Sequence, residues 1–194
     1  MNAADNVSDA RSSARDEIVL VLFDLFRRAG YDAVSLADIS EATGLGKSSL
    51  YHHFPGGKPD MAEAVAGFAR AHMRKHVFDP LGGAAPLAGK IATMIKTIAL
   101  MYEGGGAPCL IASMMVSPTA SPKAIATVRA IVSDWIATLA AALINNGAKP
   151  AEAKRRATDA VIAIQGALVV ARATGERKIF DDTMKAMRRS LTAP

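Results

Sequence analysis

The sequence has little of several things on which whole classes of protein depend. It contains one cysteine, Cys109, among 194 residues, which excludes an intrachain disulfide and a metal cluster built on cysteine. Aromatic residues make up 5% of the chain, and no segment alternates apolar and polar residues for long enough to predict a sheet. The longest apolar run, about Val161 to Ala171, is interrupted by Gln165 and is shorter than the roughly 18–20 residues of a membrane-spanning helix.

Two further absences concern location. The opening stretch, MNAADNVSDARSSARDE, holds no apolar segment, so we expect no secretory signal. The single cysteine fits a reducing compartment. We therefore expect a soluble, cytoplasmic protein that has no membrane partner.

The chain is rich in apolar residues (51%) and carries 21% charged residues, which is a globular composition and argues against disorder. Its formal net charge of +5 permits a nucleic acid, an anionic membrane or an acidic ligand as partner and selects none of them. Residues 1–60 hold six basic and nine acidic side chains, a formal charge of −3, and the remainder holds 17 basic and 9 acidic ones, a formal charge of +8. The positive excess therefore lies in the second part of the chain.

Helical periodicity covers almost the whole sequence and predicts an all-α protein with a small N-terminal unit and a larger C-terminal unit. Residues 1–12 are expected to form a mobile tail. The pair Ser35 and Asp38 is typical of a capping box at the start of a short helix that ends near Gly44. The helices are expected over about 12–30, 35–43, 47–53, 59–77, 87–102, 108–116, 122–145, 150–174 and 179–191, with a Pro/Gly-rich connector at 79–86.

Residues 35–54, SLADISEATGLGKSSLYHHF, have the outline of a helix-turn-helix, because two short helices are joined by a turn that contains Gly44. The second of these helices is expected to expose Lys47, Ser48, Ser49 and His52. Small and cationic side chains of this kind suit the major groove of DNA and its phosphates.

This stretch resembles the DNA-binding domain of the TetR family of transcriptional regulators over about residues 15–70. Its most specific part is Leu50-Tyr51-His52-His53-Phe54, and Phe54-Pro55-Gly56-Gly57-Lys58 resembles the branch of LmrA/YxaF-like repressors. The matching residues are Phe26, Gly30, Tyr31, Ser35, Asp38, Ile39, Ala42, Gly44, Leu45, Lys47, Ser48, Leu50, Tyr51, His53, Phe54 and Lys58.

The resemblance implies a role for each matching polar residue. Ser35 would cap the second helix and touch a phosphate, and Lys58 would contact another phosphate. Lys47, Ser48 and Ser49 would approach base edges, while Tyr51 and His52 would grip the DNA backbone. An alternative is that Tyr51, His53 and Phe54 only pack the small domain. Gly46 departs from the family pattern, which often has a polar cap there, so the third helix is expected to start less firmly.

The same resemblance implies a helix-turn-helix DNA-binding domain at 13–58, a connecting helix at 59–79 and a ligand-binding and dimerisation domain at 80–194. It implies a homodimer that represses from a palindromic operator on double-stranded DNA and is released by a small apolar or amphipathic effector, acting through the connecting helix. We expect no enzymatic activity, no cofactor and no metal. The alternative is an all-α ligand-binding protein or enzyme without DNA function, although no nucleophile–base pair or carboxylate pair stands out.

The effector pocket is expected among soft and aromatic side chains of the C-terminal helices, because such side chains adapt to varied apolar ligands; ordinary core packing is the alternative reading. The candidate pocket residues are Met94, Ile98, Met101, Tyr102, Cys109, Leu110, Met114, Trp135 and Gln165. The helix at 150–174 is apolar nearly all round and must bury two faces, one of them in a dimer. Its candidate interface residues are Ala160, Ala163, Gly166, Ala167 and Val170.

Three other patterns are given structural readings. Gly46-Lys47-Ser48 resembles the end of a P-loop, but Glu41 stands where that motif needs a glycine, and no strand precedes it. His72 and His76 have a metal-ligand spacing but continue an apolar helical stripe without a third ligand. Cys109 is read as a small buried hydrophobe rather than a redox sensor.

Overall fold

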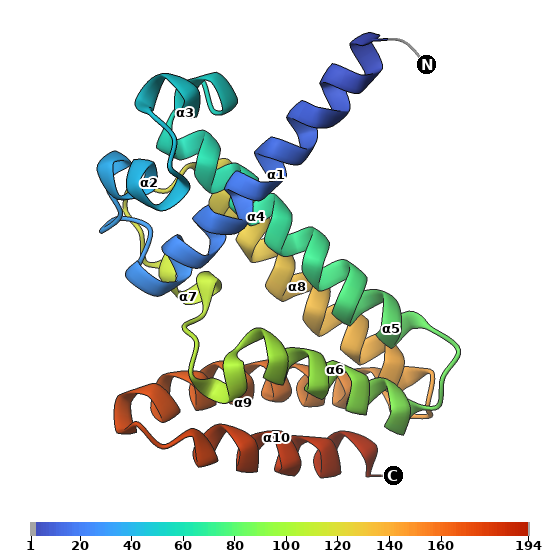
Figure 1. Cartoon of the computed structure of the whole chain (residues 1–194). Helices are drawn as coiled ribbons and strands as arrows, with labels where there is room; N and C mark the ends of the chain where they lie inside the picture. Colours follow the sequence, from blue (N-terminus) through green and yellow to red (C-terminus); the bar gives the residue numbers. More distant parts are fainter. Residues whose placement is uncertain (1–2, 194) are drawn as a thin grey trace. The chain divides into compact units, whose positions relative to one another are not determined.

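The computed structural model describes the backbone of residues 3–193 and the side chains of residues 14–193. Every regular element in that part of the chain is helical, so the all-α prediction is confirmed (Figure 1). The elements are α1 (Ala3–Ala29), α2 (Leu36–Thr43), α3 (Lys47–His53), α4 (Lys58–Met73), the π-helical turn η1 (Arg74–Phe78), α5 (Asp79–Gly82), α6 (Leu87–Met101), the 3-10 turn η2 (Glu103–Gly105), α7 (Leu110–Met115), α8 (Pro122–Ile144), α9 (Pro150–Thr174) and α10 (Arg177–Thr192).

The chain divides into two compact units. The first unit combines the chain up to Ala69 with the segment Leu110–Val128, and the second combines Arg70–Cys109 with the chain from Arg129 onward. Helices α4 and α8 each begin in the first unit and end in the second. This division differs from the expected domain bounds in one main respect, because 110–128 groups with the N-terminal helices rather than with the C-terminal ones.

The predicted capping box is confirmed at the start of α2. The Ser35 hydroxyl accepts a hydrogen bond from the Asp38 backbone N–H at 3.2 Å, and the Asp38 carboxylate accepts one from the Ser35 backbone N–H at 2.7 Å. Helix α2 ends at Gly44, whose φ of 68° lies in the left-handed region that favours glycine. Gly46 then begins α3 without any side-chain cap, as predicted.

Two helix boundaries differ from the sequence prediction. Helix α1 begins at Ala3, well before the expected start at Ser12 or Ser13, so the backbone of residues 3–12 is helical where a tail was expected. No glycine or proline precedes Gly30, and the early alanines favour helix. Farther along, the expected helix to Val77 changes into the π-helical turn η1, and α5 continues to Gly82 inside the expected connector.

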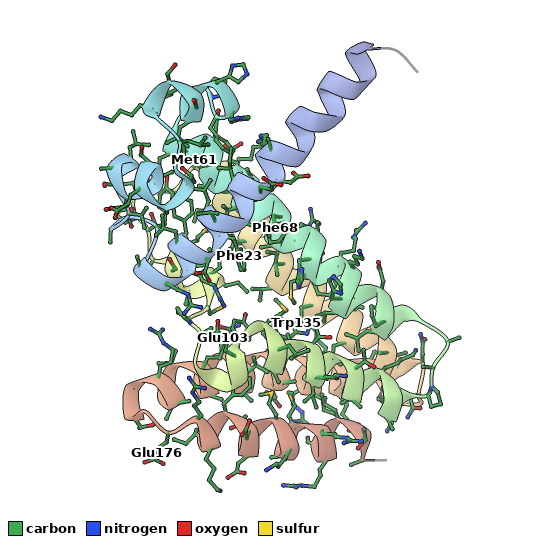
Figure 2. All side chains as sticks on the ribbon, in the orientation of Figure 1. Phe23, Met61, Phe68, Glu103, Trp135 and Glu176 are labelled. Carbon is green, nitrogen blue, oxygen red and sulfur yellow. The ribbon has the colours of Figure 1, made fainter. Side chains whose placement is uncertain are left out.

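The core of the first unit fixes the short helices against α1 and α4. Phe26, Leu50 and Phe54 are almost completely inaccessible to solvent. The rings of Phe23 on α1 and Phe68 on α4 meet edge to face with centroids 5.5 Å apart (Figure 2), a favoured aromatic geometry. Burial of these large side chains anchors the two short helices.

The second unit is a layered arrangement in which α10 packs against both α9 and α6 (Figure 1). The turn η2 comes so close to α10 that a Cβ on Gly105 would lie 2.6 Å from the Phe180 Cβ. Gly105 also has a φ of 87°, so a side chain there would be both strained and obstructed. Trp135 on α8 and Phe180 on α10 are fully buried and are among the largest side chains of this core.

Helices α8 and α9 are long and apolar enough to span a membrane when only length and composition are considered. Polar residues such as Gln165 in α9 interrupt the apolar sequence, so the uninterrupted apolar run is shorter than the helix. In each helix 39% of the most apolar window is buried inside the fold. Core helices of water-soluble proteins pass the same test, so this finding alone assigns no membrane location.

The pH dependence of stability is expected to have a contribution from His72. Burial lowers the pKa of the His72 imidazole below its ordinary 6.5, and the charges of His76 and Lys75 lower it further. The unfolded chain therefore takes up a proton at a higher pH than the folded one. The free energy of unfolding should fall as the pH drops from about 7.5 to 5.5, since only the unfolded state is stabilised by that proton.

Denaturant unfolding at a series of pH values measures this contribution. His72→Gln should flatten the fall in stability, whereas His52→Gln, which removes an imidazole from the exposed surface of α3, should leave it unchanged. Equal slopes for wild type and His72→Gln would refute the assignment.

Candidate functional site

Helix α3 presents a continuous polar face. Lys47, Ser48, Ser49, Tyr51 and His52 are all exposed, as the helix-turn-helix interpretation requires. A helix of seven residues, about two turns, carries them, and no acidic residue lies among them. Such a face can offer a cation, hydroxyl groups and an imidazole to base edges and phosphates.

The face is held from behind by two apolar side chains of the same segment. Leu50 is 1% exposed and Phe54 is fully buried, and α2 contacts α3 directly. The guanidinium of Arg15 on α1 lies 5.0 Å from the centre of the Phe54 ring. Phe54 is therefore a packing residue, which agrees with the alternative structural reading given for it.

Tyr51 is positioned by the loop that follows α3. A Cβ added to Gly57 would lie 3.3 Å from the Tyr51 ring, so the ring rests against the bare backbone of that glycine. The Gly57 backbone has a φ of 69°, and its N–H donates to the Phe54 carbonyl at 2.8 Å. The neighbouring Gly56 N–H donates to the Asp60 carboxylate at 2.6 Å. The double glycine thus makes a tight turn that seats a tyrosine still 45% exposed.

Lys58 and Ser35 are more constrained than the residues of α3. The Lys58 ammonium lies 4.5 Å from the centre of the Tyr31 ring and donates to the Asp32 carbonyl at 3.4 Å. Burial lowers the pKa of Lys58, although Asp32 and Asp38 oppose that shift. The Ser35 hydroxyl is exposed but engaged in the capping box. Lys58 therefore joins α4 to the α1–α2 connection, in addition to its predicted phosphate contact.

Polar side chains that sequence reasoning missed attach the segment 110–128 to this helix-turn-helix. The Ser113 hydroxyl donates to the Phe26 carbonyl at 3.0 Å and accepts from the Tyr31 backbone N–H at 3.1 Å. One side chain of α7 therefore bridges the two backbone groups at the end of α1. No local signal could have indicated this contact, because its partners lie more than 80 residues away in the sequence.

Two carboxylates of the first unit, Asp32 in the α1–α2 turn and Glu63 on α4, accept hydrogen bonds from further hydroxyl groups of the same segment. Asp32 accepts from the Ser117 hydroxyl at 2.8 Å and from Thr119, and these bonds lower the Asp32 pKa. Glu63 accepts from the Ser121 hydroxyl at 2.9 Å and pairs with Lys123 at 2.7 Å. We call Ser113, Ser117, Thr119 and Ser121 the hydroxyl row, since they lie along one stretch of chain.

Most of the candidate pocket residues are buried in the structure, and they fall in both units. Met94, Ile98 and Trp135 are fully buried in the second unit, where the Tyr102 hydroxyl lies 3.3 Å from the Cys109 sulfur. Leu110 and Met114 are buried in the first unit. Met101 and Gln165 are partly exposed. Their role as a ligand pocket stays a prediction.

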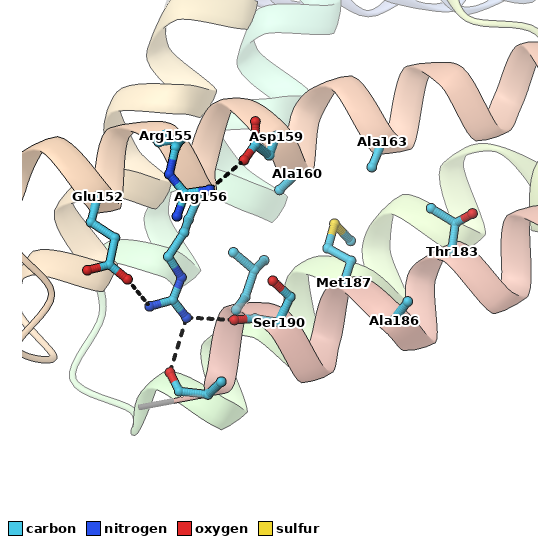
Figure 3. A pocket seen from close by; sticks show the side chains of 12 residues that line it. Glu152, Arg155, Arg156, Asp159, Ala160, Ala163, Thr183, Ala186, Met187 and Ser190 are labelled. Carbon is cyan, nitrogen blue, oxygen red and sulfur yellow. Dashed lines mark hydrogen bonds and ion pairs between the residues drawn. The ribbon is translucent and has the colours of Figure 1, made fainter.

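The candidate interface residues of α9 face different ways. Ala160 and Ala163 line a groove of about 440 Å³ between α9 and α10 (Figure 3). Ala167 is buried. Gly166 and Val170 instead lie on the exposed side of the helix.

The exposed side of α9 also carries two large apolar residues that are not in the candidate interface set. Ile162 and Val169 are each 63% exposed. The sequence predicts one contact surface for the small residues of α9, but Ala160 and Ala163 line the groove between α9 and α10.

The Arg156 side chain fills the charged end of the α9–α10 groove. Arg156, with 12% of its side chain exposed, donates to the carbonyls of Ser190 and Ala193 at 2.6 and 3.1 Å (Figure 3). It also pairs with Glu152 at 3.6 Å. A cation that bonds the last carbonyls of a helix stabilises its C-terminus. The groove is therefore a seam that ties α10 to α9.

The hydroxyl row makes a stability prediction. Ser113→Ala removes the partner of the Tyr31 N–H and leaves the Phe26 carbonyl with the Gly30 N–H alone. The free energy of unfolding should fall by about 1–3 kcal/mol, since a buried donor left unpaired is costly. Ser48→Ala, on the exposed face of α3, is the matched control and should change stability by less than about 0.5 kcal/mol. Denaturant melts measure both, and equal effects would contradict the bridging role.

Comparisons with known protein families cover most of the chain. Residues 18–65 match the model of the bacterial regulatory proteins of the tetR family. Residues 85–186 match the C-terminal domain of the LmrA/YxaF-like transcriptional regulators. The two matched regions include α3 with its polar face and most of the second unit.

The individual relatives share a low fraction of identical residues with this chain, and one of them matches it over nearly its whole length. The HTH-type transcriptional regulator Rv0196 of Mycobacterium tuberculosis is 24% identical over 183 residues, covering 92% of this chain and 94% of that protein. The HTH-type transcriptional repressor KstR2 of Rhodococcus jostii is 31% identical over 98 residues, covering 49% of this chain and 48% of that protein.

A solved TetR-family regulator from Agrobacterium tumefaciens superposes with a TM-score of 0.81 at 24% identity, covering 94% of this chain and all of that one, which supports the fold. The two family models together carry the assignment to a non-enzymatic family of regulators. The chain belongs to the TetR family of helix-turn-helix transcriptional regulators and has an LmrA/YxaF-like C-terminal domain.

Proposed function

We propose that this regulator is a homodimeric, cytoplasmic repressor that binds a palindromic operator and is released from it by a small, largely apolar ligand. The observation that carries the DNA-binding half is the polar face of α3, where Lys47, Ser48, Ser49, Tyr51 and His52 are exposed together. Repression is favoured because one relative is named a transcriptional repressor. A cytoplasmic location follows from DNA as the partner.

DNA affinity must come from the placement of charge rather than from its total. Residues 1–60 are formally −3, so the first unit has no general attraction for phosphate. Lys47 stands at the first turn of α3, where the N-terminal backbone N–H groups of the helix also favour an anion. Tyr51 adds a hydroxyl held in place by Gly57. Short-range contacts of this kind position the helix on the duplex.

The second half of the proposal is a two-fold dimer built on α8 and α9. A groove of about 580 Å³ on these helices is lined by Val132, Ile136, Thr158, Val161, Ile162, Gln165, Gly166, Val169 and Val170. None of these side chains is charged, and Ile162, Val169 and Val170 are largely exposed. Exposed apolar patches of this kind mark interaction surfaces. A second copy is the fitting occupant because a two-fold axis sets the same apolar patch against itself.

The two-fold symmetry of the proposed dimer would determine the symmetry of the operator. Two copies of α3 related by a two-fold axis can enter successive major grooves about one DNA turn apart, which requires a palindrome. Ligand release would act through α4, because this helix begins beside the DNA-reading face at Lys58 and ends in the second unit at Met73. A ligand that binds one arrangement of the helices more tightly would shift the population toward it.

Lys47→Ala is the direct test of the reading face. The affinity for an operator fragment from the DNA next to the gene should fall about tenfold, because one charged contact is lost. The slope of log affinity against log salt should decrease by about 1 if the contact is to a phosphate. Fluorescence anisotropy with labelled fragments measures both quantities.

Lys154→Ala is the control, since it removes the same charge from an exposed site on α9. It should leave affinity and salt slope near wild type. Equal losses in the two variants would mean that binding follows total charge, and no binding of the wild-type protein to any neighbouring fragment would overturn the proposed function.

Val169→Asp tests the dimer. A charge placed at a residue that is 63% exposed in the single chain should leave the fold intact but be buried unpaired in the interface. Light scattering should therefore report a monomer, and operator affinity should fall with it. Val116→Asp, at a valine 81% exposed on the first unit, is the matched control and should stay dimeric. A dimeric, fully active Val169→Asp protein would exclude this face.

A further inference from the structure

The apolar α8–α9 groove, proposed as the dimer face, has two unusual residues near its middle. Most of its lining residues belong to α9, where they run from Thr158 to Val170. Gln165 and Gly166 lie near the centre of that stretch. The centre of the face therefore lies on α9, at about the position of these two residues.

The Gln165 amide is incompletely paired in a single chain. Its Nε2 is buried and has no hydrogen-bond partner among the described residues, although the side chain as a whole is partly exposed and lines the groove. Thr158, the other polar residue of the groove, lies about two helical turns away and donates its hydroxyl to the Lys154 carbonyl at 2.9 Å. An unpaired buried donor is unfavourable, so a partner that arrives with a second copy would stabilise the interface.

Gly166 is an independent sign of a close neighbour, because nothing in its own chain requires a glycine there. It lies in the interior of α9, where glycine destabilises a helix relative to alanine. It does not have a positive φ, and a Cβ built on it would meet none of the described residues within 4 Å. Bare backbone on the exposed side of a helix lets another helix approach closely. We therefore look for that helix outside the chain.

We infer that the α9 helices of two copies cross at Gly166 and that the two Gln165 amides donate to each other across the two-fold axis. This inference rests on the proposed dimer and names the residues that align it. The centre of a two-fold interface meets its own copy, so a residue at the middle of the face meets itself. An amide carries both a donor and an acceptor, and it is therefore complementary to a second amide. The last side-chain torsion of a glutamine is soft, so the nitrogen can turn toward the axis.

The amide pair would give the interface a single alignment. The neighbouring residues Ile162 and Val169 are similar in chemistry, so apolar contact alone would tolerate several positions of one helix along the other. Sliding by one turn would set each amide against an apolar side chain and leave it buried without a partner. One polar residue within an apolar helical interface specifies the alignment in this way, at some cost in stability.

Disulfide cross-linking locates the axis. Cys109 is the single cysteine of the chain, so in a Cys109→Ala background an introduced cysteine can bond only to its own copy. Gln165→Cys, oxidised in air with a copper catalyst, should cross-link about tenfold faster than Thr158→Cys or Val170→Cys, since a disulfide needs Cα atoms about 4.4–6.8 Å apart. Equal rates at the three positions, a faster rate at either end of the groove, or no cross-link in a dimeric Gln165→Cys protein would overturn the inference.

Two glycine variants test the crossing without changing Gln165. Gly166→Leu should keep the fold, because its side chain meets open space in a single chain, but should raise the dimer dissociation constant about tenfold to a hundredfold by overpacking the crossing. Gly67→Leu is the matched control, at an exposed glycine in the interior of α4 whose added Cβ also meets nothing within 4 Å, and should dimerise like wild type. Circular dichroism reports the fold and sedimentation equilibrium the dissociation constant. A Gly166→Leu dimer as tight as wild type would refute the crossing.

Gln165→Glu tests the pairing itself. Two carboxylates that face each other at the axis repel, so this variant should dimerise about tenfold more weakly than wild type at pH 7.5. The difference should shrink toward pH 5, where a protonated carboxyl group can donate to its copy. Wild type measured at each pH is the reference. A dissociation constant that matches wild type at both pH values would contradict the amide pair.

Light scattering and operator binding of the wild-type protein separate a failure of this inference from a failure of the proposed function. A wild-type protein that is dimeric and binds its operator, while cross-linking is fastest away from Gln165, loses only the assigned alignment. A monomeric wild-type protein would overturn the proposed dimer and this inference with it.

Discussion

The DNA-reading face depends on the burial of two side chains. Helix α3 has seven residues, and an isolated helix of that length is not stable in water. Gly46 gives its start no side-chain cap, so capping cannot compensate. Two buried side chains hold the helix in place: Leu50, in the middle of α3, and Phe54, directly after its last residue. Because those two face inward, the helical repeat turns Lys47, Ser48, Ser49, Tyr51 and His52 outward together, and the face exists only as long as the core behind it does.

The hydroxyl row extends this dependence to a distant segment. Hydroxyl groups of 113–121 bond to backbone at the end of α1 and to Asp32 and Glu63, so the start of α8 is bonded to the same small unit that carries α3. Helix α8 continues beyond Val128 as part of the second unit and there carries Trp135.

Helix bounds and caps could be predicted from the sequence where the interactions that determine them are between neighbouring residues. The Ser35–Asp38 capping box, the left-handed Gly44 and the bounds of α2, α3 and α9 follow from neighbouring residues and were predicted correctly. The start of α1 was placed too late because a serine was read as a cap where helix-forming residues precede it. Contacts such as Ser113 with Phe26, and the seating of Tyr51 on Gly57, arise from tertiary structure and have no signature in one sequence. The small residues of α9 were grouped as one interface because small size indicates close approach without saying to which neighbour.

Helix α9 shows how one element serves both the fold and assembly. Its inward side uses alanines such as Ala160, which let α10 approach, and Arg156 secures the end of α10. Its outward side uses Ile162, Val169 and Val170, whose exposure is unfavourable in a single chain. The small side chains shorten the distance between helices within the chain, whereas the branched ones would provide apolar area for the second copy that we propose. That asymmetry would make the proposed assembly separable from folding, since a polar change on the outward side leaves the bonds between Arg156 and the end of α10 in place.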